Sequence, residues 1–131
     1  MTPSPAFDLN NPPEGQGPVV KLVALMLREC VSMGAPAARL GRVEGENIFL
    51  EVYRDGNWTD MMAFTGPVYE ALVAQLRSMA TMGVPGMAPE QGLIRALWGG
   101  EQRRIGLSEA RSSTGPERIE LTFGEGVHPA V

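Results

Sequence analysis

The sequence predicts an α+β fold with antiparallel sheet, in which two main helices and six strands follow the order α-β-β-β-α-β-β-β. Two segments repeat apolar residues with the 3.6-residue period of a helix, and others alternate apolar and polar residues as half-buried strands do. At 131 residues, the chain is close to the length of one ordinary domain. We therefore expect one α+β domain over residues 18–124, between an N-terminal and a C-terminal tail.

The two tails are predicted from composition. Residues 1–17 are rich in proline, glycine and asparagine, and only Phe7 and Leu9 are sizeable apolar groups. Such a segment buries too little apolar surface to offset its ordering entropy, so we expect it to be disordered. Residues 125–131 are expected to form a short C-terminal tail that contains His128, the only histidine.

The first helix is predicted to begin at Pro18, because proline suits the first helical position, and to end at Gly34. The segment Val19–Met33 is apolar nearly all round, which is typical of a helix that is mostly buried. A second helix opens at Gly66-Pro67 and is expected to run to Met82, where Gly83 closes it.

Three strands are predicted between the helices, from Arg39 to Phe64, and they include a β-hairpin. Apolar and other residues alternate from Ile48 to Tyr53, and Asp55-Gly56 suits the positive φ angles of a type I′ turn. A two-residue turn here would place Tyr53 opposite Trp58, Glu51 opposite Asp60 and Phe49 opposite Met62.

Three more strands are predicted after the second helix, at Leu93–Trp98, Gln102–Leu107 and Arg118–Phe123. The alternation predicts which side chains lie beneath the helix Pro67–Met82: Ile48, Leu50, Val52, Ile119, Leu121 and Phe123.

Composition argues against several classes of function. The net charge is −4 and the basic residues are dispersed, so we expect no nucleic-acid partner. The single Cys30 and the single His128 cannot supply a disulfide or a Cys/His zinc site. No secretory signal and no uninterrupted membrane-spanning stretch is evident, which predicts a cytoplasmic protein without direct membrane insertion.

The sequence shows no clear catalytic motif. The sequence contains no Gly-Lys pair, so it has no phosphate-binding P-loop, and we expect neither a cofactor nor ATP hydrolysis. Acid–base chemistry by carboxylate pairs such as Glu44/Glu46 or Glu51/Asp60 remains open, although charged residues on turns and strand faces are usually just solvated. The prediction is a protein that is not an enzyme.

The hairpin offers a candidate partner-binding surface. If both helices cover the aliphatic face of the hairpin, its other face would present Phe49, Tyr53, Trp58 and Met62, residue types that are enriched in interfaces. The alternative is that a helix or the N-terminal tail covers this group, through Phe7 and Leu9. An interface here would suit a homodimer as well as a complex with another protein.

Residues 18–124 resemble the N-terminal, non-motor domain of type II secretion and type IV pilus assembly ATPases. The resemblance lies in the order of four short motifs, which are the Arg54-Asp55-Gly56 hairpin, a helix ending in Gln-Leu-Arg-Ser-Met-Ala-Thr-Met (75–82), a Pro-Glu-Gln-Gly-Leu turn (89–93) and a Gly-Pro-Glu-Arg-Ile-Glu-Leu strand (115–121). It implies a cytoplasmic, bacterial module that docks onto a secretion or pilus-type assembly component.

The departures from the family limit what the resemblance implies. The family's arginine after the turn is Leu93 here, and the one on the next strand corresponds to Ser108, or to Arg111 if the register slips. The motor with its Walker motifs is absent from this sequence. The resemblance therefore implies a divergent interaction or regulatory module. A second hypothesis is a sensor of a small molecule, nucleotide or anion that uses Arg95, Arg103, Arg104 and Arg111.

Overall fold

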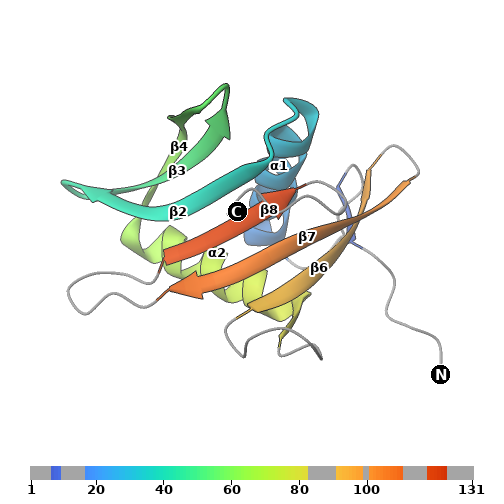
Figure 1. The fold of residues 1–131 in the computed structure, drawn as a ribbon. Helices are drawn as coiled ribbons and strands as arrows, with labels where there is room; N and C mark the ends of the chain where they lie inside the picture. Colours follow the sequence, from blue (N-terminus) through green and yellow to red (C-terminus); the bar gives the residue numbers. More distant parts are fainter. Residues whose placement is uncertain (1–6, 10–16, 83–90, 99–100, 111–117, 124–131) are drawn as a thin grey trace.

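Two helices lie on one face of a single mixed sheet in the computed structural model, and no described helix or strand covers the other face, which we call the open face (Figure 1). The structure describes residues 7–9, 17–82, 91–98, 101–110 and 118–123. In chain order the elements are β1 (Phe7–Asp8), α1 (Pro18–Ser32), β2 (Ala37–Glu44), β3 (Asn47–Arg54), β4 (Asn57–Thr65), α2 (Gly66–Met79), β5 (Ala80–Met82), β6 (Gln91–Trp98), β7 (Glu101–Ala110) and β8 (Arg118–Phe123).

The strand order across the sheet is β1-β6-β7-β8-β2-β3-β4, and β5 also pairs with β6. Strand β8 pairs antiparallel with β2 and so joins the first hairpin to the strands that follow α2. All described pairings are antiparallel except β1 with β6. The predicted α+β class is confirmed, and the short strands β1 and β5 are additions to the predicted order.

Helix α1 follows the sequence prediction closely. Pro18 occupies its first turn, and Gly34 adopts a φ of +72° just beyond its end. That conformation costs glycine little because it has no Cβ. The buried side of α1 carries only apolar residues and cysteine: Val20, Val23, Ala24, Met26, Leu27 and Cys30.

Helix α2 ends at Met79, three residues before the predicted end at Met82. Residues 80–82 instead form β5, in which Ala80 pairs with Ile94 and Thr81 with Leu93. Sheet pairing at this position overrides the apolar helical period that suggested a longer helix. A bidentate ion pair connects the end of α2 to β7. Arg77 donates from Nε and Nη2 to the carboxylate of Glu109 at 2.7 and 3.1 Å.

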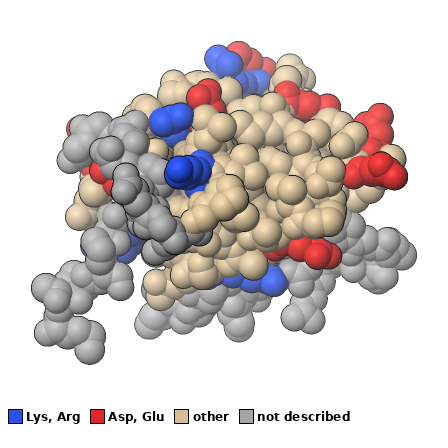
Figure 2. All heavy atoms as spheres, turned by 180° about the vertical axis from the view of Figure 1, so that it is seen from behind, with Lys and Arg blue, Asp and Glu red and all other residues tan. Residues whose placement is uncertain are grey.

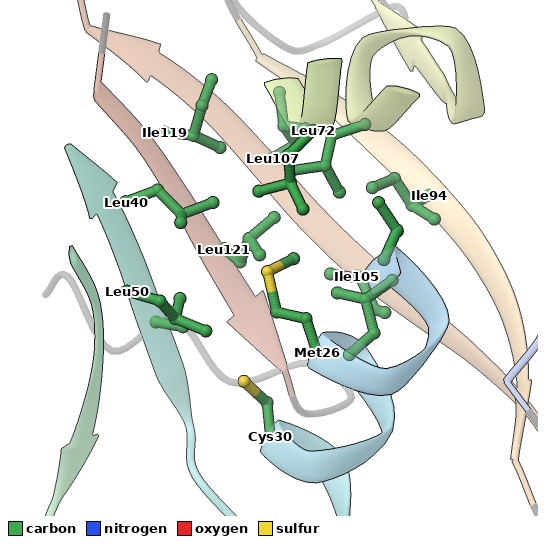
Figure 3. Packing of buried hydrophobic residues seen from close by; sticks show 14 of the residues in the cluster. Met26, Cys30, Leu40, Leu50, Leu72, Ile94, Ile105, Leu107, Ile119 and Leu121 are labelled. Atoms are coloured by element: carbon green, nitrogen blue, oxygen red, sulfur yellow. The ribbon is translucent and has the colours of Figure 1, made fainter. Parts of the chain in front are cut away.

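The core lies between the sheet and the two helices (Figure 3). Met26 and Cys30 of α1 and Leu72 of α2 point toward buried side chains of β2, β3, β6, β7 and β8. The six residues predicted to be buried all belong to this cluster: Ile48, Leu50, Val52, Ile119, Leu121 and Phe123. Period-2 alternation therefore identified the inward face of β3 and β8 correctly.

The hairpin turn between β3 and β4 has the predicted geometry, with φ of +51° at Asp55 and +83° at Gly56. Tyr53 pairs with Trp58 and Glu51 with Asp60, as expected. A β-bulge at Met61 then shifts the register, so that Leu50 lies opposite Met62, and Phe49 opposite Ala63. The predicted pairing of Phe49 with Met62 is wrong, because the extra residue reverses the alternation.

A second register shift lies in β2, at Gly41. Its φ is +134°, and a Cβ at this position would lie 3.1 Å from the Cα of Arg118. Both observations require glycine. Leu40 pairs with Leu50, and Arg42, two positions later, pairs with Phe49, which is adjacent to Leu50 in β3. Arg42 therefore emerges on the same face of the sheet as Arg39, which strict alternation would not allow.

The N-terminal residues that the structure describes do not form the predicted disordered tail. Phe7 and Asp8 pair in parallel with Ala96 and Leu97, and the backbone N–H of Leu9 donates to the carbonyl of Leu97 at 3.0 Å. The side chain of Leu9 is fully buried in the core. The tail prediction is wrong for residues 7–9, since a single leucine in the core ties the segment down. The other residues of both predicted tails lie outside the described ranges.

Candidate functional site

Three of the four residues predicted to bind a partner lie on the open face of the sheet. Phe49 and Tyr53 of β3 alternate with the buried Leu50 and Val52, and Trp58 lies directly opposite Tyr53. All three rings are half-buried. The fourth residue, Met62, lies opposite Leu50 and packs against the core on the helix side, so it is not part of this surface.

Two arginines from the neighbouring strand β2 stack on these aromatic rings. The guanidinium carbon of Arg39 lies 4.1 Å from the centre of the Trp58 ring, and that of Arg42 lies 4.3 Å from the centre of the Phe49 ring. The rings of Tyr53 and Trp58 meet edge to face with centres 5.2 Å apart. Stacking of this kind is attractive because the faces of aromatic rings carry partial negative charge.

A buried carboxylate holds the two arginines in place. Glu51 lies between them on β3, with its side chain only 9% exposed. Its Oε1 accepts a hydrogen bond from Arg39 Nε at 3.0 Å, and its Oε2 lies 3.5 Å from Arg42 Nε. Because a buried carboxylate is costly without partners, Glu51 and the two arginines stabilise each other's positions.

Arg42 also binds two exposed carboxylates. Its Nη2 donates to Asp60 of β4 at 2.6 Å, and its Nη1 donates to Glu44 at 2.7 Å. The hydrogen bond to Asp60, followed by the one to Glu44, raises the pKa of the Arg42 guanidinium above its usual value. Arg42 therefore stays charged throughout the pH range in which the protein is handled.

We call this set the arginine–aromatic cluster; its members are Arg39, Arg42, Phe49, Glu51, Tyr53, Trp58 and Asp60. Sequence reasoning found the three rings and the pairing of Glu51 with Asp60, but it missed the two arginines. The only feature of the sequence that pointed to Arg39 and Arg42 was their place in the strand just before the hairpin. The position of Arg42 beside Arg39 depends on the register shift at Gly41, which the sequence pattern does not reveal.

The four arginines of the sensor hypothesis do not form one group. Arg95 and Arg104 lie directly opposite each other on β6 and β7, on the open face. Arg103 pairs with the buried Ala96 and so lies on the helix side of the sheet. Arg111 lies outside the described residues.

Arg103 lines a small cleft of about 250 Å³ between the end of α1 and the ends of β7 and β8. The other lining residues are mostly apolar or small: Val31, Gly34, Ala35, Pro36, Arg104, Ile105 and Phe123. The Nε of Arg103 is buried without a hydrogen-bond partner. The cleft is smaller than ordinary ligand pockets, which begin at about 300 Å³.

The helix-covered side of the molecule has a different character. Charged side chains lie mostly toward the periphery of this side, and uncharged residues occupy most of its centre (Figure 2). Leu25 of α1 and Val68 of α2 are exposed large apolar residues. Within the described ranges, neither helix has the length and apolarity needed to cross a membrane. The same ranges contain no group of three or more His, Cys, Asp or Glu side chains suited to a metal ion.

Comparison with models of known protein families and with curated proteins found no match. The candidate site therefore has to be interpreted from its own chemistry. It combines stacked aromatic rings, paired arginines and a buried carboxylate on a face that the helices leave open.

Proposed function

We propose that this protein is a non-enzymatic interaction module that docks a partner protein onto the open face of the sheet, at the arginine–aromatic cluster. The observation that carries the proposal is the stacking of Arg39 on Trp58 and of Arg42 on Phe49. Tryptophan, tyrosine and arginine are the residues that most often dominate the energy of protein interfaces. Here they stand together on adjacent strands.

The cluster is also ordered before any partner arrives. Glu51 and Asp60 bind the arginines through the contacts described above, so these long side chains have already lost much of their rotamer freedom. Binding then costs less entropy, since about 0.5–1.5 kcal/mol is lost for each flexible side chain that an interface immobilises. A surface of this kind favours recognition over catalysis.

The class of partner rests on the resemblance of residues 18–124 to the N-terminal domain of secretion and pilus assembly ATPases. That resemblance supports a component of a secretion or pilus-type assembly as the partner, and a regulatory or scaffolding role for the module in the cytoplasm. The arginine–aromatic cluster provides the contact surface in this proposal.

The proposal is tested by the variant Trp58→Ala. Tagged wild-type protein from its native host should enrich one partner, and binding of the purified pair should weaken by about 30-fold or more in the variant, as for a central interface residue of about 2 kcal/mol. Leu25→Ala removes an exposed apolar side chain from the helix side and is the matched control. Undiminished binding by a folded Trp58→Ala protein, checked by circular dichroism, would contradict the proposal.

A second candidate function, anion binding, is favoured by the position of Arg95 opposite Arg104. Like charges directly opposite each other on adjacent strands are destabilising, and no ion pair is found for either residue within the described ranges. A bound phosphate group would relieve this repulsion.

Thermal unfolding with inorganic phosphate, pyrophosphate and ATP tests this second candidate. If one of them binds here, the midpoint temperature of wild-type protein should rise with the logarithm of its concentration above the Kd, and the increase should disappear in Arg95→Gln/Arg104→Gln. A chloride series at matched ionic strength is the control for screening. Equal responses of wild-type and variant proteins would place any anion elsewhere.

A further inference from the structure

The two edges of the sheet differ in how they are covered. At one edge, β6 is flanked by two short strands from distant parts of the chain, β1 and β5. At the other edge, β4 pairs with β3 on one side, and none of the described residues pairs with its outer side. An uncovered edge presents a row of backbone donors and acceptors that another strand can use.

Strand β4 carries few of the features that usually prevent edge pairing. It spans nine residues, Asn57–Thr65, without lysine, arginine or proline. Its one charged residue is Asp60, whose carboxylate is bound by Arg42 on the open face of the sheet. Proteins commonly protect edges with short strands, lysine, proline or bulges, and β4 has only the bulge at Met61.

We propose that β4 pairs antiparallel with β4 of a second copy of this chain, about a two-fold axis perpendicular to the sheet, so that one sheet runs continuously through a dimer. The same strand then provides both sides of the interface, as a two-fold contact requires. The self-association is a property of the edge, separate from the docking of a partner protein on the open face.

The bulge limits the registers in which two copies of β4 can pair. Residues directly opposite each other in a sheet share a face. Trp58 and Ala63 lie on the open face, opposite Tyr53 and Phe49, whereas Thr59 and Met62 lie on the helix side, opposite Val52 and Leu50. Among the registers that respect both faces, the one we propose puts Thr59 of one copy opposite Met62 of the other, and Trp58 opposite Ala63.

This register is sterically favourable and keeps the irregularity at the centre. The large Trp58 ring lies beside a small alanine of the second copy, and the half-buried Met62 gains cover from Thr59. The two-fold axis passes between Asp60 and Met61, so the bulges of both copies meet there. The regular segments on either side, Asn57–Asp60 and Met62–Thr65, are left free to pair. In this register the first half of β4 pairs with the second half of β4 from another molecule. The partner that fits this edge is therefore a second copy of the chain.

Light scattering across micromolar concentrations tests the association itself. We expect wild-type protein to form a concentration-dependent dimer and Thr59→Lys to be monomeric, because lysine on an edge strand opposes edge pairing. Thr59 is exposed, so the substitution leaves the core intact. Ser78→Lys adds the same charge on the exposed side of α2 and should dimerise like wild type. A wild-type monomer at all concentrations, or a dimer of Thr59→Lys as stable as that of the control, would overturn the proposal.

Cysteine cross-linking tests the register. Opposed residues on antiparallel strands have Cα atoms about 4.5–5.5 Å apart, within disulfide range. Under mild oxidation, Thr59→Cys/Met62→Cys should therefore give a covalent dimer, and each single variant should stay monomeric on a non-reducing gel. Within one strand the two positions are about 10 Å apart, too far for an internal bond. The native Cys30 is buried and leaves the readout unaffected.

The two proposals fail separately. Loss of the dimer in Thr59→Lys with partner binding retained supports the edge dimer and leaves the docking surface in place. A double-cysteine variant that does not cross-link, or a single variant that cross-links as efficiently, would refute the proposed pairing even if a partner protein binds at Trp58.

Discussion

Replacing Leu9 with alanine should lower the free energy of unfolding by about 2–5 kcal/mol, the usual cost of truncating a fully buried leucine. The side chain of Leu9 is 0% exposed and belongs to the same core cluster as Ile94 and Ala96 of β6. The composition of this segment predicts disorder. If the segment were disordered, the same substitution would change the free energy of unfolding by almost nothing. Urea denaturation followed by circular dichroism measures the difference directly.

Leu25 provides the matched control for this prediction. It is also a leucine, but its side chain is 36% exposed on the outer surface of α1. We expect Leu25→Ala to change the free energy of unfolding by less than about 0.5 kcal/mol, after allowance for the good helix propensity of alanine. If Leu9→Ala were as mild as Leu25→Ala, the N-terminal segment would not be docked in the core.

Alkaline pH should destabilise the fold through two buried acids. Desolvation, together with the nearby charge of Glu29, raises the pKa of Cys30 from 9.0 to about 12. Desolvation also raises the pKa of Tyr69 from 10.0 to about 12, against the opposing effect of Arg77 and Arg118. The fold prefers the neutral form of both groups, so their contribution is complete below the pKa of the unfolded chain and is lost as pH rises toward 12.

The size of this loss follows from proton linkage. Between the unfolded and folded pKa values of Cys30, the unfolded chain has released a proton that the folded chain keeps, which costs about 1.4 kcal/mol per pH unit. We therefore expect Cys30 alone to lower the free energy of unfolding by about 2 kcal/mol from about pH 8 to about pH 10.5. Urea titrations in reducing buffer at several pH values between these limits measure the slope.

Two variants show how much of the pH dependence of the free energy of unfolding comes from Cys30 and how much from Tyr69. Cys30→Ala should remove most of the decline that begins near the unfolded pKa of 9.0, at a pH-independent cost for the lost sulfur. Tyr69→Phe should act only above the unfolded pKa of 10.0. A slope that stays unchanged in Cys30→Ala would assign the alkaline loss to other groups.

Most of the secondary structure could be predicted because it depends on local chemistry. Proline at the start of α1 and glycine after its end determine where that helix begins and stops, and Asp55-Gly56 determines the hairpin turn. Alternation in β3 and β8 determines which side chains face the core, since successive residues of a strand point to opposite faces. These features need no knowledge of distant segments.

The candidate site required the tertiary structure. The register shifts at Gly41 and Met61 each add one residue to a strand, which brings Arg42 onto the open face and removes Met62 from it. Strands β1 and β5 likewise exist because β6 offers a sheet edge to pair with. A bulge or an edge pairing is decided by backbone hydrogen bonds between segments far apart in sequence, whereas turns and amphipathic periods are decided by neighbouring residues. The sequence therefore determined the helices, the hairpin and the buried faces, and only the packed sheet assembled arginine, carboxylate and aromatic ring into one surface.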